Sequence, residues 1–132
     1  MRKIGLLLVL SLLLVACGDY TETGTSTTSR RGMQGGEETV KIAKANGTSG
    51  KSLEVEDDSL LEVDVTLSAG KGSYKIELLG QDDKVTLTLE ARDGKTVSGH
   101  GQMASDSFGD ASYRVTAVDA ENVAYTLKYT YR

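Results

Sequence analysis

Hydrophobic and polar residues alternate one by one along most of the chain after residue 37, and this alternation constrains the fold more than any other feature. A period of two puts every second side chain on the same face of a β-strand, so each run predicts a half-buried strand. Alternating runs cover residues 39–43, 52–56, 61–67, 73–78, 85–91, 113–117 and 123–131. A run over residues 96–103 is interrupted by Gly99 and Gly101 and predicts a short or bulged strand.

Turn-forming residues lie between these runs. Gly, Asn and Asp supply the positive φ angles that tight hairpins require. They occur at residues 46–47, 69–72, 80–83, 92–95 and 119–122. Seven or eight short strands joined mostly by hairpins predict an all-β domain, an antiparallel β-sandwich or a small barrel. A chain of 132 residues has room for one such domain.

The first sixteen residues follow a different pattern. Arg2 and Lys3 precede a mainly apolar segment, residues 4–16. A charged start followed by a short apolar segment is typical of a secretory signal, and the segment is shorter than the ~20 residues that a spanning helix needs. The sequence Leu14-Val15-Ala16-Cys17 ends this segment. It resembles the lipobox of bacterial lipoproteins.

The resemblance implies cleavage between Ala16 and Cys17, and a diacylglycerol or acyl lipid (such as palmitate) attached to Cys17. The alternative is an ordinary signal peptide, residues 1–16, with a cysteine at this position by chance. Two acyl chains give a durable membrane anchor, whereas one binds only marginally. We therefore expect the chain in the cell envelope, lipid-anchored on the extracytoplasmic side of the cell membrane, or in the outer membrane if the organism has two. No other cofactor is expected.

Residues 17–36 predict a flexible tether after the lipidated cysteine. Thr, Ser and Gly dominate this stretch, and Tyr20 and Met33 are its only large apolar residues. Such a composition buries little surface, and a chain of this length spans about 25 Å on average. The folded domain is predicted over residues 37–132.

Part of that domain resembles pre-peptidase C-terminal domains, small β-sandwich modules of secreted bacterial enzymes. The resemblance covers residues 72–78, the strands around residues 93–95, and the closing run 123–129. Two departures weaken it: Tyr129 stands where that family has Val or Ile, and the acidic and aromatic opening of the family is missing.

The charge balance argues against a nucleic-acid partner. From Cys17 onward the chain has 13 Lys and Arg against 19 Asp and Glu. An acidic domain repels polyanions.

The sequence contains none of the common catalytic motifs, and we predict that the protein is not an enzyme. His100 could act as a general base with Asp106 or Asp110, but a histidine exposed on a Gly-rich turn explains it as well. Adjacent acidic residues at 57–58 and 82–83, with Asp106 and Asp110, could supply oxygen ligands to calcium. Solvated turns are the alternative; if calcium binds, Asp106 and Asp110 are the first candidates.

The aromatic residues suggest two kinds of partner. Tyr125, Tyr129 and Tyr131 share one face of the last strand, where tyrosines either fill the core or stack on sugars. Phe108 stands alone in a polar loop, so Phe108 and His100 are the candidate contact residues of the 99–110 segment. Exposed tyrosine rings favour a glycan partner, and a protruding Phe108 favours a protein.

The sequence therefore predicts a lipid-anchored binding or scaffolding module of the bacterial cell envelope. Its expected partners are the membrane, through the lipid, and an envelope protein or a glycan. The alternative function is an inhibitor or accessory subunit of an envelope or secreted hydrolase.

Overall fold

The computed structural model describes residues 20–132. The predictions for the signal segment, Ala16 and Cys17 lie outside these residues. The elements are β1 (Thr21–Thr23), β2 (Ser26–Arg31), β3 (Gly35–Glu54), β4 (Leu60–Leu79), the short 3₁₀ helix η1 (Gln81–Asp83), β5 (Val85–Arg92), β6 (Lys95–Ala104) and β7 (Asp110–Tyr131). All strand pairs are antiparallel, which confirms the all-β prediction. No helix in this part of the chain is long and apolar enough to cross a membrane.

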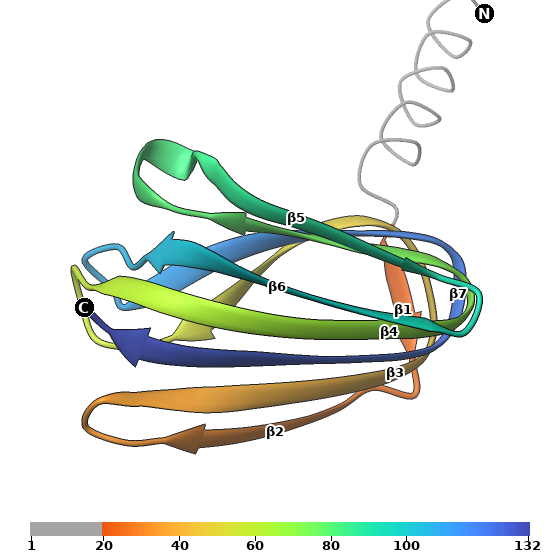
Figure 1. Cartoon of the computed structure of the whole chain (residues 1–132), viewed down its shortest axis with the longest axis horizontal. Coiled ribbons are helices and arrows are strands. Elements are labelled where there is room, and N and C mark those ends of the chain that lie inside the picture. The colour runs from red at the N-terminus through yellow and green to blue at the C-terminus, as the bar shows by residue number, and fades with distance from the viewer. Residues whose placement is uncertain (1–19) are drawn as a thin grey trace, which may run out of the picture.

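The three longest strands, β3, β4 and β7, bend in the middle and pass from one layer of the sandwich into the other (Figure 1). In the first layer the order is β2, residues 35–45 of β3, residues 120–131 of β7, residues 60–69 of β4, and β6. In the second layer it is residues 47–54 of β3, 110–118 of β7, 73–79 of β4, and β5. The strands thus form one continuous sheet folded over on itself.

Three of the predicted hairpin turns are these bends. The register of β3 shifts between Ala45 and Gly47, and that of β4 shifts between Lys71 and Ser73. Asp119 and Asn122 of β7 have positive φ angles. The strands are therefore longer than predicted, because Gly, Asn and Asp at positive φ suit a bulge inside a strand as well as a hairpin. Gly72 is required at its bend, since its φ is 67° and a Cβ would collide with the carbonyl oxygens of Val118 and Asp119.

The segment expected to be a tether is strand over most of its described length. β1 pairs with residues 44–46 of β3, and β2 pairs with residues 36–41. Threonine favours extended backbone, and two ion pairs hold β2: Arg30 to Glu37 at 3.1 Å and Arg31 to Glu54 at 2.9 Å. All six β2 side chains are exposed. Backbone pairing, rather than core burial, therefore orders β2.

β1 closes one open edge between the layers. The Tyr20 hydroxyl donates to Glu22 Oε1 at 2.6 Å and lies 3.1 Å from the Tyr74 hydroxyl. Lys51 Nζ is 2.9 Å from the same Glu22 oxygen. Burial raises the pKa of Glu22, but the hydrogen bonds from Tyr20, Lys51 and Thr25 outweigh it, so the pKa lies below its usual value. Tyr20 and β1 thus belong to the folded unit of the described chain.

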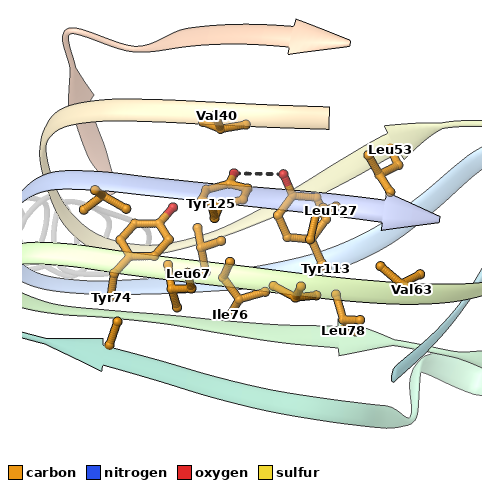
Figure 2. Close-up of a cluster of buried hydrophobic side chains, with 14 of the residues drawn as sticks. Val40, Leu53, Val63, Leu67, Tyr74, Ile76, Leu78, Tyr113, Tyr125 and Leu127 are labelled. Atoms are coloured by element: carbon orange, nitrogen blue, oxygen red, sulfur yellow. Dashed lines mark hydrogen bonds between the residues drawn. The ribbon is translucent and has the colours of Figure 1, made fainter. Parts of the chain in front are cut away.

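The core lies between the layers, and no polar or charged residue of the described chain is fully buried. Figure 2 shows Tyr113 and Tyr125 with their hydroxyl groups joined at 2.9 Å, next to Leu127. The rings of Tyr74 and Tyr125 stack with centroids 5.8 Å apart, and burial raises the pKa of Tyr74 to about 12. These tyrosines, with Tyr129, fill the core instead of presenting a face to sugars.

Candidate functional site

One end of the sandwich consists of connecting loops, and the other consists mainly of the bends within the long strands. One end, which we call the loop end, carries segments 31–34, 54–59, 80–84 and 104–110 (left in Figure 1). The other, the corner end, carries the three strand bends and the β5–β6 turn, segments 44–47, 70–72, 92–95 and 118–122. The loop end contains Phe108 and all the acidic calcium candidates of the sequence, but not His100.

The loop end holds a hollow of about 760 Å³. Aspartates from three separate segments line it: Asp58, Asp82, Asp83, Asp106 and Asp110. The sequence does not predict that these aspartates lie around one hollow, because the bends of β3, β4 and β7 bring the three segments together. At this end the four segments contain eight acidic and only two basic side chains.

The loop before β7 presents Phe108 to solvent with 85% of its surface exposed. Asp106 Oδ1 accepts hydrogen bonds from the backbone N–H groups of Phe108 at 2.9 Å and Asp110 at 3.0 Å. Hydrogen bonds from these backbone groups hold the pKa of Asp106 below its usual value. Asp106 therefore fixes the loop that carries the phenyl ring.

Further hydrogen bonds join this loop to the turn that precedes β4. Ser105 Oγ donates to the Glu56 carbonyl at 2.6 Å and accepts from the Ser59 N–H at 2.7 Å. The Val55 N–H donates to the Gly109 carbonyl at 2.8 Å. Phe108 thus projects from two cross-linked turns.

The acidic residues of the loop end have no arrangement that defines a metal centre. Within residues 20–132, no group of three or more His, Cys, Asp or Glu side chains is placed to hold a metal ion. Calcium binding by Asp106 and Asp110 stays a prediction.

His100 lies within β6, on the exposed face of the first layer, rather than on a turn. Its Nδ1 is 2.8 Å from Asp64 Oδ1 and its Nε2 is 3.0 Å from Glu62 Oε1. The hydrogen bonds to Glu62 and then to Asp64 raise the pKa of His100. The pairing with Asp106 or Asp110 considered above is not formed, because the β4–β6 register sets Asp64 opposite His100.

His100 ends a row of alternating charge across the five strands of the first layer. The residues opposite one another, strand by strand, are Arg30, Glu37, Lys128, Asp64 and His100. Opposite charges across strands stabilise a pairing, and a slip by one residue would move the whole row to the core face. The row therefore helps to specify the register.

The free energy of unfolding is expected to depend on the charge of His100. Its folded pKa lies above the ordinary value of 6.5, so its contribution is complete below about pH 6.5 and is lost as the pH rises through the folded pKa. As the pH rises from about 5.5 to 9, the free energy of unfolding of wild type, measured with urea, should fall relative to that of His100→Gln. Parallel curves for the two proteins would show that the pairing contributes nothing.

Comparison with known proteins finds similarity only among solved structures. No protein-family model matches the chain, and no curated protein matches it. The CBM22-1 xylan-binding domain of Paenibacillus barcinonensis Xyn10C is 13% identical, covers 85% of each chain and has a TM-score of 0.41. A Bacillus endospore appendage protein is 8% identical over 83% of this chain and 93% of its own, with a TM-score of 0.44.

A third similar structure is the cupin domain of Schizosaccharomyces pombe Cnp3. It is 8% identical, covers 85% of this chain and 64% of its own, and has a TM-score of 0.41. Each of these three likenesses concerns the all-β fold alone.

Proposed function

We propose that the chain is a lipid-anchored, extracytoplasmic binding module of the bacterial cell envelope, which holds a protein partner at its loop end. The lipid is the one that the lipobox resemblance implies on Cys17. The observation that carries the binding role is the exposed phenyl ring of Phe108 on its fixed loop. The role assigned to the module is binding, not catalysis.

Phe108 has the properties of an interface anchor. Removing a large apolar side chain from water contributes about 1.5–3 kcal/mol, and aromatic residues are enriched among the residues that dominate binding energy. The hydrogen bonds of Asp106 and Ser105 already order the loop. Binding therefore has less conformational entropy to remove from this segment.

The charge of the loop end indicates the partner's chemistry. The four loop-end segments contain eight acidic and two basic side chains, Arg132 adds a third basic one at this end, and five of the aspartates line the hollow. Such a surface attracts a partner with a basic patch and speeds its association. A protein with a basic rim around an apolar pocket fits both features. A glycan stacked on tyrosine is less well supported, because Tyr74, Tyr113, Tyr125 and Tyr129 are buried.

Capture from solubilised envelope should depend on Phe108. We expect immobilised residues 20–132 to retain one protein in near-stoichiometric amount, and Phe108→Ser to retain at least about tenfold less, equivalent to 1.4 kcal/mol. Val118→Ser is the matched control, because Val118 is also exposed, at 57%, but lies at the corner end. Capture should weaken as salt is raised.

Three results would contradict the proposal: equal capture by Phe108→Ser and wild type, equal loss in both variants, or recovery of glycan without protein. The identity of the captured protein decides between a scaffold and the alternative function. A hydrolase whose activity falls in the complex indicates an inhibitor, and one whose activity rises indicates an accessory subunit.

A further inference from the structure

The position of β1 determines which end of the sandwich meets the membrane. We infer that the corner end lies against the lipid headgroups and that the loop end faces away from the bilayer. This inference rests on the proposed lipid anchor at Cys17. It names a lipid surface as the partner of the corner end.

The chain between the anchor and the folded domain is short. Tyr20 is three residues after Cys17, and an extended residue spans about 3.3–3.6 Å. The two residues are therefore at most about 11 Å apart. A flexible tether of residues 17–36, in contrast, would span about 25 Å.

The domain end of this connection is fixed at the corner end. Thr21, Glu22 and Thr23 pair with Asn46, Ala45 and Lys44, where β3 bends. The Tyr20 hydroxyl contacts both Glu22 and Tyr74. The attachment point thus cannot move along the domain without breaking β1 away from β3.

The loop end lies a domain length away. Residues 60–69 of β4 run from the loop end to the corner end, and ten residues of strand extend about 30 Å. That is nearly three times the reach of the connection. The loop end can approach the bilayer only if the whole domain tips onto its side.

The charges of the two ends oppose that tipping. With Glu22 of β1 included, the corner end contains four basic and four acidic side chains, whereas the loop end, with Arg132 included, contains three basic and eight acidic. Lys44, Lys71 and Lys95 at the corner end are exposed and form no salt bridge with residues 20–132. A membrane surface with anionic lipids attracts lysines and repels carboxylates within a Debye length. The same surface therefore repels the loop end more strongly than the corner end.

Energy transfer from two labelled positions tests the orientation. Full-length lipidated protein is purified as Val118→Cys or Phe108→Cys, each with one thiol beyond the lipidated Cys17. The labelled protein is placed in phosphatidylethanolamine–phosphatidylglycerol vesicles that carry an acceptor dye on a headgroup. We expect strong energy transfer from position 118 and weak transfer from position 108. The distances of the two labels from the plane of the headgroups should differ by about 30 Å.

A flexible insertion provides the matched control. Twenty Gly and Ser residues placed between Asp19 and Tyr20 should remove most of the difference between the two positions, because the domain can then rotate. Equal transfer from both positions in the uninserted protein, or stronger transfer from position 108, would overturn the orientation.

Flotation of the same samples separates the two proposals. If the protein floats with the vesicles but energy transfer is equal from both positions, the lipid anchor is supported and the proposed orientation is wrong. Protein that carries no lipid on Cys17 and does not float overturns the anchor, and the orientation with it.

Discussion

Replacing Cys17 with serine is expected to move the mature protein from the membrane to the soluble fraction. A serine hydroxyl cannot form the thioether that attaches diacylglycerol, and each buried CH₂ of an acyl chain contributes about 0.8 kcal/mol. A protein anchored by two chains on Cys17 alone should therefore be released entirely by this one substitution. Fractionation with an antibody to the folded domain, together with incorporation of labelled palmitate, measures both the release and the lost modification.

Two controls make this result specific. Gly18→Ser changes the neighbouring residue and keeps the thiol, so it should stay lipidated and membrane-bound. Mass spectrometry of the Cys17→Ser protein shows whether residues 1–16 were removed, because an uncleaved apolar segment would hold the chain by itself. A cleaved, unlipidated variant that remains in the bilayer would show that the lipobox interpretation is wrong.

Removing residues 20–36 is expected to destabilise the domain by more than about 3 kcal/mol, which is a large part of the stability of a domain of this size. The shorter fragment, residues 37–132, lacks β1, β2 and the first residues of β3. Tyr74 then loses its contact with the Tyr20 hydroxyl, the core loses the partly buried Tyr20 ring, and Lys51 loses its partner Glu22. Burial of one large side chain contributes about 1.5–3 kcal/mol, and the lost strand pairing adds to this.

Urea unfolding of residues 20–132 and 37–132, followed by circular dichroism, measures the difference. If the shorter fragment does not fold, Tyr20→Ala in the longer one still reports the contribution of the ring. Equal unfolding midpoints for the two fragments would show that residues 20–36 behave as the flexible tether that their composition predicts.

The period-two alternation predicts the strands because it reflects burial directly. The runs at 85–91 and 96–103 correspond to β5 and β6 almost residue for residue. The short or bulged strand expected from Gly99 and Gly101 is wrong, because β6 pairs with β4 in continuous register over ten residues. The bends could not be predicted, because Asn46-Gly47 and Gly70 to Gly72 have the composition of hairpin turns. Only the pairing of β3 and β4 with β7 shows that these strands continue through them.

The candidate site, like the strands, could be predicted from the sequence only in part. Phe108 could be identified because a large apolar side chain in a polar loop has no local partner, and the structure exposes it. The partners of His100 could not be identified from the sequence, because Asp64 is 36 residues away and lies opposite His100 only through the β4–β6 register. β2 was missed because its order comes from backbone hydrogen bonds, which side-chain composition does not reveal.

The place of β7 in the sheet also decides when the fold can form. In both layers β7 lies between β3 and β4, and these two strands pair with it and not with each other. Its 22 residues are nearly the last of the chain. Pairings between distant segments form slowly, so neither layer has its central strand until β7, the last of the seven strands in the sequence, has been made. The strands that precede β7 therefore cannot assemble into the two layers by themselves, and the domain folds only when β7 joins β3 and β4.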